Sequence, residues 1–496
     1  MHLSDPAVVG LNSLRKALES CSQDARLHAG NEVGPARLIS LSPETTAISD
    51  HSNRYQTAQP AFSARLVDGS RCRDGRYLAL SYVWGLAPRQ KYRATTIATL
   101  AAHQTKIPVD ELAKTFRDAL TTVWLLGFKF VWIDTLCIVQ DSEEDWKLNS
   151  FAVRARTFSR AFATIVAPTE EVDQSFFGHI DHLHRPNKLA TRLVNEQNHF
   201  VHKPRQLFSQ QIGSDQPTSN RAWCLHETEL SQRLIYFRPV SGCTKSCFEP
   251  RMVWQATRHE MSRYAYWYAI VQEYSRRHLT RASDRLLALA PLATEFHLLT
   301  GAKYTAGLWQ EDLFRGLLWS CSSSSRLKRL EKFPTWSWAS VPVEVRYIYS
   351  GQLRLVQHES LSILDIDDSS IESYSPGVCQ ASLLLRGCIG RAKSTFDLTT
   401  GAHLWFFEEE GFTLQVKLLL DCQEVSPNQL TCNIMFIYMG HIPGPNDNST
   451  LIVLVLRAVD TDTAGSVRYR RMGLAEVPQD EHLHILDGDR LAISII

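Results

Sequence analysis

The chain has 496 residues, of which 44% are hydrophobic, and this length predicts two to four domains of roughly 100–200 residues each. A net charge of +1 argues against a general nucleic-acid binder, which carries a clear basic excess. The longest aliphatic run, 451–456, is far shorter than the about 20 residues that span a bilayer. Eleven cysteines are scattered without a dense framework, so we expect free thiols and a cytoplasmic location.

The first 61 residues are more polar than the rest of the chain. Residues 8–18 have weak helical periodicity, and serine, threonine, asparagine and glutamine dominate 40–59. This composition predicts a short helix followed by a loosely ordered connector.

Strand and helix patterns then alternate. The apolar runs 77–82, 130–133 and 163–167 have the length and composition of buried strands. Between the first two, 111–126 repeats apolar residues at three- and four-residue steps and is closed by Gly127, as expected for an amphipathic helix. A further helix is expected from the acidic start at 141–145, capped by Ser142, burying Trp146 and apolar residues as far as Phe162.

This alternation is typical of a parallel α/β sheet, in which ligands bind beyond the carboxyl ends of the strands. Residues 81–85 and 134–141 both fall at such ends. The strand-like run 234–237 comes after a short helix expected from about 221 to 230.

Residues 170–220 are long, polar and rich in histidine, and we interpret them as a surface insertion. The pairs His182/His184 and His199/His202 lack an accompanying cysteine or acidic residue at a recognised ligand spacing, and Cys243 and Cys247 form a lone pair. We therefore predict no metal site.

The remainder of the chain divides by pattern into a helical segment at 250–345 and a β-rich segment at 346–496. Tyr264, Trp267, Ile270, Val271 and Tyr274 line one helical face, and a second helix is expected at 286–298. Strand signals at 382–385, 414–420, 433–438, 452–456 and 491–495 are separated by turn residues.

Three blocks carry a resemblance to a known family. They read Tyr-Leu-Ala-Leu-Ser-Tyr-Val-Trp-Gly at 77–85, Trp-Ile-Asp-Thr-Leu-Cys-Ile-Val-Gln at 132–140 and Arg-Ala-Trp-Cys-Leu-His-Glu at 221–227. In order and spacing they resemble the fungal heterokaryon incompatibility (HET) domain, and the likeness continues through 274–286 to 469–473. The family usually has glutamine where this chain has His226, a departure that affects ligand orientation if that glutamine serves it.

The resemblance implies an α/β HET domain at 62–240 that acts in fungal non-self recognition and programmed cell death. It implies partnership with other incompatibility or sensor proteins and a homo-oligomer formed through this domain. A role as an accessory or regulatory protein of a metabolic pathway is a further alternative.

Residues 223–227 are also similar to the Trp-Cys-Leu-x-Glu segment of TIR domains, whose glutamate is catalytic in the NAD-cleaving members. This similarity implies a TIR-like sheet and, as an alternative function, an NAD-glycohydrolase reaction in which NAD is the substrate rather than a bound cofactor.

The candidate catalytic residues are therefore Glu227 and Asp134. Each also has a structural interpretation: Glu227 as an ion-pair partner of Arg221 or Arg233, and Asp134 as a loop cap. The expected ligand-binding residues are Ser81, Tyr82, Trp84, Gly85, Arg221 and Trp223. For the tryptophans the alternative is packing in a core, and for Ser81 it is close backbone approach.

Overall fold

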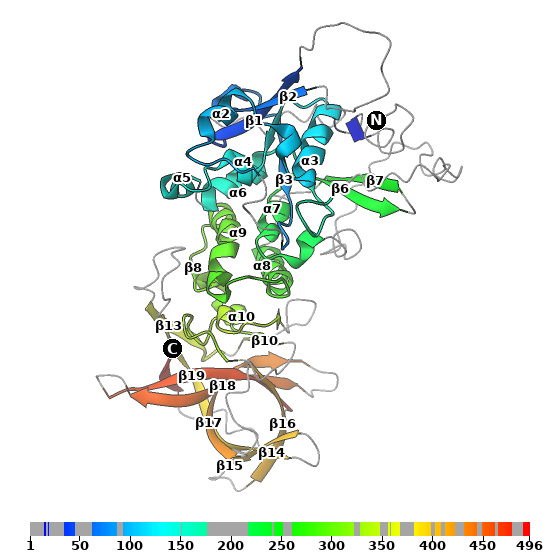
Figure 1. Ribbon diagram of the computed structural model, residues 1–496. Helices are drawn as coiled ribbons and strands as arrows, with labels where there is room; N and C mark the ends of the chain where they lie inside the picture. The colour runs from blue at the N-terminus through cyan, green and yellow to red at the C-terminus, as the bar shows by residue number, and fades with distance from the viewer. Residues whose placement is uncertain are drawn as a thin grey trace, which may run out of the picture. The chain divides into compact units, whose positions relative to one another are not determined.

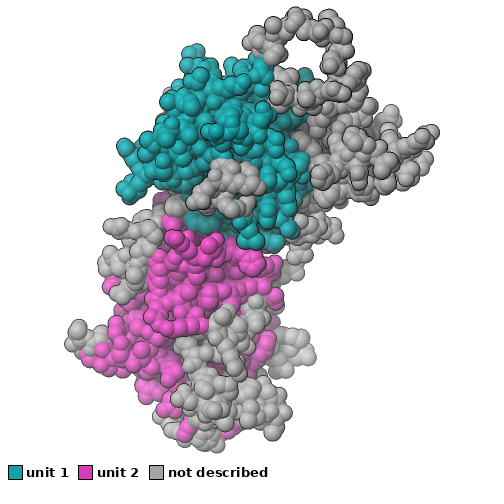
Figure 2. Space-filling view, in the orientation of Figure 1, with its two compact units in different colours: residues 1–256 teal, residues 257–496 magenta. Residues whose placement is uncertain are grey.

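The structure is a computed structural model with two compact units, residues 1–256 and 257–496 (Figure 2). The residues it describes are 14, 15, 18, 34–44, 62–86, 93–149, 151–175, 217–240, 243–250, 260–321, 328–347, 356–357, 359–367, 381–397, 402–407, 412–421, 431–443, 449–461, 465–478 and 490–496. The helix expected at 8–18, most of the connector at 40–59 and the histidine pairs of 182–202 lie wholly or largely outside these residues.

Unit 1 is built on a seven-stranded sheet with the order β2-β1-β4-β3-β5-β6-β7 (Figure 1). The strands are β1 (Arg37–Pro43), β2 (Phe62–Asp68), β3 (Tyr77–Ser81), β4 (Phe130–Trp132), β5 (Ala163–Val166), β6 (Arg233–Val240) and β7 (Cys243–Pro250). The four central strands β4, β3, β5 and β6 are parallel, whereas β1, β2 and β7 join in antiparallel fashion. The predicted parallel α/β sheet is confirmed.

The helices of unit 1 largely agree with the sequence pattern. They are α2 (Leu100–Thr105), α3 (Lys114–Leu125), α4 (Asp134–Cys137), α5 (Glu143–Leu148), α6 (Phe151–Arg160) and α7 (Cys224–Glu229). The amphipathic helix expected at 111–126 is α3, and Gly127 comes after it with φ +79°. Ser142 caps α5, because its side chain accepts a hydrogen bond from the backbone N–H of Asp145.

The prediction of one helix from 141 to 162 is wrong, because the chain forms α5 and α6 in its place. Asn149 ends α5, and its side-chain amide donates to the backbone carbonyl of Asp145 at 2.9 Å. Such a local side-chain bond competes with continuation of the helix. Trp146, on the shorter α5, is only partly buried, whereas Phe158 on α6 is 2% exposed.

Strand β1 was not expected, because its second half, from residue 40, lies in the segment 40–59 that was interpreted as a connector. Its Leu38, Ile39 and Leu41 are buried, and it pairs with β2 on one side and β4 on the other. Arg37 at its start donates to the Asp145 carboxylate at 2.5 and 3.0 Å, so the strand also anchors α5.

Unit 2 begins with helices whose aromatic face is buried as predicted. They are α8 (Glu260–Ser275), α9 (Arg285–Thr300) and the short α10 (Leu313–Gly316). Trp267 is fully buried and packs edge-on against Trp309 with ring centroids 5.1 Å apart. The short strand pairs β8 (Tyr304–Thr305) with β9 (Leu308–Trp309), and β10 (Trp319–Cys321) with β11 (Val345–Tyr347), accompany these helices.

The β-rich region forms a nine-stranded sheet in the same unit. Its strands are β12 (Val356–Gln357), β13 (Ser362–Asp367), β14 (Ser382–Asp397), β15 (Ala402–Phe407), β16 (Phe412–Leu420), β17 (Thr431–Ile442), β18 (Thr450–Thr461), β19 (Val467–Pro478) and β20 (Arg490–Ile495). Because β14 pairs with both β15 and β17, the strands β14–β19 close into an antiparallel ring. Trp405 stacks on Phe436 in the apolar cluster formed by these strands.

A buried charge network fixes this region to the strand pair β10–β11. Arg471 is fully buried, its guanidinium lies 3.7 Å from the ring centroid of Trp319, and its Nε donates to Asp421 at 2.8 Å. Asp421 also receives Nη2 of Arg329 at 3.0 Å. The remaining Arg471 donors bond the backbone carbonyls of Leu317 and Trp319, so this buried cation is satisfied on every side.

Candidate functional site

The first feature of the site is a contact between β3 and α7. Ser81 ends β3, is fully buried, and donates from Oγ to Oε2 of Glu227 at 2.5 Å. In the described part of the chain the other carboxylate oxygen, Oε1, has no hydrogen-bond partner. The backbone carbonyl of Glu227 accepts from Ser231 Oγ at 2.5 Å, and Ser231 shares a hydrogen bond with Thr164 on β5. Glu227 is therefore anchored to two neighbouring strands.

The second feature joins the first two blocks. Tyr82 donates from its phenol to Oδ1 of Asp134 at 2.7 Å and shares a hydrogen bond of 2.5 Å with Thr135 Oγ1. The backbone N–H of Thr135 also donates to Asp134 Oδ1, at 2.6 Å. Asp134 thus begins α4 with one carboxylate oxygen fully used. Among the described residues, its Oδ2 accepts no hydrogen bond.

The third block reaches the same place through its backbone-directed contacts. Arg221 Nη1 donates to the carbonyl of Tyr82 at 3.5 Å, the upper limit for such a bond, and Cys224 Sγ lies 3.6 Å from the same oxygen. Ser81, Tyr82, Asp134, Arg221 and Glu227 are thereby brought together from three separate stretches of sequence.

Trp84 and Gly85 have a different setting. The Trp84 ring is tilted against those of Tyr82 and Phe116, with centroids 6.4 and 6.3 Å apart, so it contributes to packing while remaining partly exposed. Gly85 has φ +77°, and a Cβ there would lie 2.8 Å from the carbonyl oxygen of Glu170. Only glycine fits this turn without strain.

The strand order explains why these residues meet. The chain passes from β3 to β4 on one side and then to β5 on the other, so the connections diverge between β3 and β5. Ligands of open parallel sheets bind at the carboxyl ends of strands where such a divergence occurs. Ser81 and Val166 are adjacent in register at this end, and α7 contacts both strands.

The family model for heterokaryon incompatibility proteins (HET) matches residues 77–227. These limits are the first residue of β3 and the glutamate that Ser81 binds, so all three blocks are included. The chain carries a heterokaryon incompatibility domain. Comparison with curated proteins and with solved structures finds no match. The likeness to TIR domains and the likeness in 274–286 and 469–473 stay predictions.

Electrostatics within the HET domain centre on Glu227. Burial raises the pKa of its carboxyl group to about 7, and the neighbouring charge of Asp134 acts in the same direction. The hydrogen bond from Ser81 and the charges of Arg221 and Arg154 oppose this rise. Near neutral pH, Glu227 therefore exchanges readily between its charged and neutral forms, as a proton-transferring group must.

Arg154 on α6 is the residue of this site that the sequence prediction missed. Its guanidinium carbon lies 5.6 Å from the ring centroid of Trp146 and 5.8 Å from that of Trp223. Burial lowers the pKa of Arg154, while the charges of Asp134 and Glu227 raise it. A signal was present in the sequence: an arginine three residues after Phe151 and four before Phe158 interrupts the apolar stripe of the helix.

His226, the residue that departs from the usual family pattern, is 2% exposed and lies edge-on to Phe158 at 6.2 Å. Its Nδ1 is buried without a hydrogen-bond partner in the part of the chain that the structure describes. Burial, reinforced by the charge of Arg154, lowers the pKa of the imidazole to about 3. His226 is therefore a neutral packing residue at physiological pH.

The two structural interpretations of Glu227 and Asp134 have different outcomes. Arg233 is turned toward Phe162, donating to its carbonyl at 3.2 Å and covering its ring at 4.7 Å, and is no ion-pair partner of Glu227. Asp134 does cap its own loop through the N–H of Thr135. Its second oxygen accepts no hydrogen bond from the residues that the structure describes, so the capping role and a role in binding are compatible.

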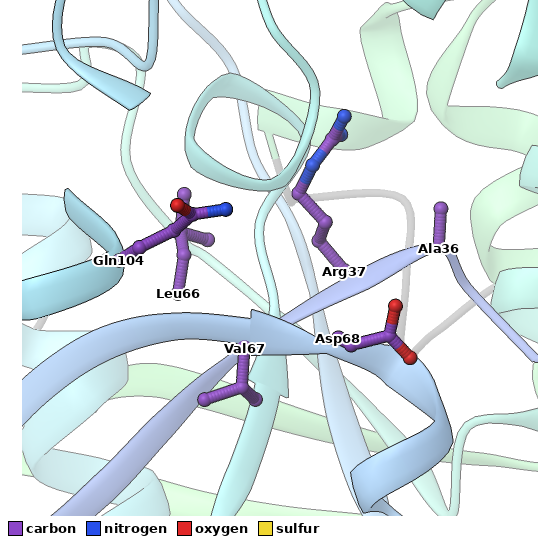
Figure 3. Close-up of a pocket in the computed structure, with 6 residues that line it drawn as sticks. All are labelled: Ala36, Arg37, Leu66, Val67, Asp68 and Gln104. Carbon is purple, nitrogen blue, oxygen red and sulfur yellow. The ribbon is translucent and has the colours of Figure 1, made fainter. Parts of the chain in front are cut away.

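A cavity of about 220 Å³ lies elsewhere in unit 1, between the paired strands β1 and β2 and helix α2 (Figure 3). Its lining residues are Ala36, Arg37, Leu66, Val67, Asp68 and Gln104. The charged groups of this cavity are already engaged, since Arg37 binds Asp145 and Asp68 accepts from Ser70 N–H. The chemistry-bearing residues lie at the Ser81–Glu227 contact, and we place the candidate site there.

Within the described ranges, no group of three or more His, Cys, Asp or Glu side chains is arranged to hold a metal ion. For Cys243 and Cys247 on β7 the structure describes the backbone strand but not the side chains. Each helix that the structure describes is too short or too polar to cross a bilayer.

Proposed function

We propose that this chain acts in fungal non-self recognition, with its HET domain triggering programmed cell death. The observation that carries the proposal is the convergence of three distant blocks on the Ser81–Glu227 and Tyr82–Asp134 contacts. This convergence supports the proposal that the chain is a functional copy of the domain.

The proposal includes a cytoplasmic location and protein partners. Cys137 and Cys388 are buried cysteines without a disulfide, which supports a reducing compartment. We further propose that other incompatibility or sensor proteins supply the trigger and that the HET domain self-associates.

The test is inducible expression of the full chain in a fungal host, with viable cells counted after induction. The wild-type chain is expected to reduce viability, and Glu227→Gln at equal level is expected to abolish the effect. Glu143→Gln is the matched control, because Glu143 is an exposed acid whose ion pair with Lys147 is superficial. Full viability with the wild-type chain at high expression would count against the cell-death role.

The environment of Glu227 favours a second candidate, an NAD-glycohydrolase activity. Departure of nicotinamide takes both electrons of its bond to the ribose and leaves positive charge at the ribose C1′. A carboxylate at this position stabilises that charge, and it then accepts a proton from the water that adds to C1′. Glu227 fits this role because one oxygen is held by Ser81 while the other has no partner among the described residues.

The remaining site residues have compatible chemistry. The planar guanidinium of Arg221 suits a pyrophosphate group, and the partly exposed rings of Trp84 and Trp223 suit stacking on a base. Ser81, Tyr82 and Gly85 would then shape the binding surface, and Asp134 would contribute its available oxygen to the ribose.

This second candidate is tested by incubating the purified full chain with NAD and measuring released nicotinamide. Release by the wild type and its loss in Glu227→Gln would support catalysis. Cell killing by a Glu227→Gln chain that releases no nicotinamide would identify assembly, rather than catalysis, as the basis of the signal.

A further inference from the structure

Arg154 lies outside the three HET blocks, yet its side chain lies near Trp223 of the third block. Its helix, α6, contacts α7, and its guanidinium lies near the ring of Trp223, the residue that precedes α7. Glu227 comes four positions after Trp223 and therefore lies on the same side of the helix, one turn along. The guanidinium of Arg154 therefore lies beside the start of α7, the helix that carries Glu227.

Two indole rings hold the cation in this position. The guanidinium carbon is within 6 Å of the ring centroids of both Trp146 and Trp223, the range in which a cation is attracted to an aromatic ring. The Trp146 ring is itself fixed by a hydrogen bond of 3.2 Å from its Nε1 to the carbonyl of Gln140. The flat guanidinium of arginine suits such a position better than the compact ammonium of lysine.

Three charged side chains act on the ionisation of Arg154. Asp134 on α4 and Glu227 on α7 both favour its charged form, whereas Arg221 opposes it. The side chains that shift the pKa of Glu227 are Ser81 on β3, Asp134 on α4, Arg221 before α7 and Arg154 on α6. Two cations thus face two acids, and removal of either cation leaves excess negative charge in a poorly solvated site.

We propose that Arg154 is a positioning residue, the shared counter-cation of Asp134 and Glu227, held in place by the indoles of Trp146 and Trp223. Its charge favours the ionised form of Glu227 and opposes the effect of burial on that carboxyl group. For its consequence in catalysis the proposal rests on the NAD-cleaving function proposed above, because that reaction uses the ionised form of Glu227.

The test measures the ionisation of Glu227 directly, by carbon NMR of the full chain with labelled glutamate carboxyl groups. The Glu227 signal is the one missing from the Glu227→Gln spectrum. Arg154→Met is expected to raise the midpoint of the Glu227 titration by roughly 0.5 to 1 pH unit, which is a three- to tenfold change in the ionisation constant. Arg221→Met should raise it further, since the charge of Arg221 acts more strongly on Glu227.

Two controls separate charge from packing. Arg156→Met removes an exposed arginine from the same helix and should leave the midpoint unchanged. Arg154→Lys keeps the charge but replaces the flat guanidinium with a compact ammonium group, so the Glu227 midpoint should stay near that of the wild type while the melting temperature falls. Should Arg154→Met fail to fold, Arg154→Gln removes the same charge and is measured in its place.

An unchanged midpoint in a folded, charge-removing variant at 154 would overturn the proposal. If the titration shifts as expected but the wild-type chain releases no nicotinamide from NAD, the counter-cation role stands and the catalytic function fails. If both hold, the pH profile of nicotinamide release should move with the NMR midpoint.

Discussion

Ser81 and Glu227, which lie 146 positions apart, share a hydrogen bond of 2.5 Å between the Ser81 hydroxyl and Glu227 Oε2. This bond connects the end of a central strand to α7. It also favours the charged form of a carboxyl group that burial pushes toward the neutral form. Removal of the hydroxyl therefore has an effect on titration as well as on stability.

Ser81→Ala should raise the pKa of Glu227 above its wild-type value of about 7, because the bond that favours the carboxylate is lost. It should also lower the free energy of unfolding by roughly 0.5–1.5 kcal/mol at pH 8. The carboxyl titration and denaturant unfolding measure the two effects. Ser42→Ala, which removes a bond of 2.9 Å to Ser63, serves as control and should not move the Glu227 midpoint.

Glu227→Gln should change how stability depends on pH. The folded-state pKa of about 7 exceeds the ordinary value of 4.5, so the folded protein binds the proton more tightly. The resulting stability is fully present below pH 4.5 and is lost as pH rises through 7. Denaturant unfolding from pH 4 to 9 measures the free energy of unfolding of both proteins. As pH increases, the wild type should lose stability relative to the Gln variant. A difference in unfolding free energy that stays constant across this range would contradict the raised pKa of Glu227.

His226→Gln should act in the opposite range. The folded-state pKa of about 3 is below the ordinary value of 6.5, so the unfolded chain binds the proton more tightly. Stability from this residue is present above pH 6.5 and is lost as pH falls toward 3. The variant should consequently retain more of its stability than the wild type between pH 6 and 4. If both proteins lost the same unfolding free energy on acidification, protonation of the His226 imidazole would not destabilise the fold.

Asp134→Asn should leave the fold nearly intact, since an amide oxygen can still accept from Tyr82 and from the N–H of Thr135. Asp134→Ala leaves that buried N–H unpaired and should cost about 1–3 kcal/mol of unfolding free energy. The pair of variants distinguishes the capping geometry from the negative charge. Similar large losses of melting temperature in both would show that the charge itself is structural.

Trp132→Ala should unfold or aggregate the protein, because truncation of a core aromatic costs roughly 3–5 kcal/mol. Trp132 is 2% exposed and packs edge-on against Phe158 at 5.4 Å. The partly exposed Trp124, which packs on Phe62 at 5.6 Å, gives a comparison variant expected to lose less. Thermal unfolding of both proteins measures the contrast, and equal losses would contradict the special place of Trp132 in the core.

The central strands and the convergence of the three blocks were predictable because each block is a continuous pattern with a fixed place at a strand end. The contacts of Arg154 were not predictable in the same way, since they depend on where α5 and α7 bring two tryptophans. Strand β1 was missed because its buried residues 38–41 are few and lie beside polar sequence. Its place in the sheet comes from long-range pairing with β4, which no local pattern encodes.

The β-rich segment illustrates the same limit. Its strand signals were visible one by one, but the closed ring depends on β14 pairing with different partners along its length. Gly390 allows one of these pairings, because the ring of Phe436 lies 2.1 Å from where a Cβ would be. Register of this kind depends on tertiary packing rather than on local propensity.

The network of Arg329, Asp421 and Arg471 has a consequence for how unit 2 can change over evolutionary time. Loss of one partner from a buried ion pair costs roughly 3–5 kcal/mol, a large part of the roughly 5–15 kcal/mol that holds a domain folded. Replacement of the whole network by well-packed apolar side chains carries no such penalty. Accumulated single substitutions therefore cannot reach the apolar solution without passing through unstable intermediates, and a library randomised at all three positions should return correlated rather than independent residues.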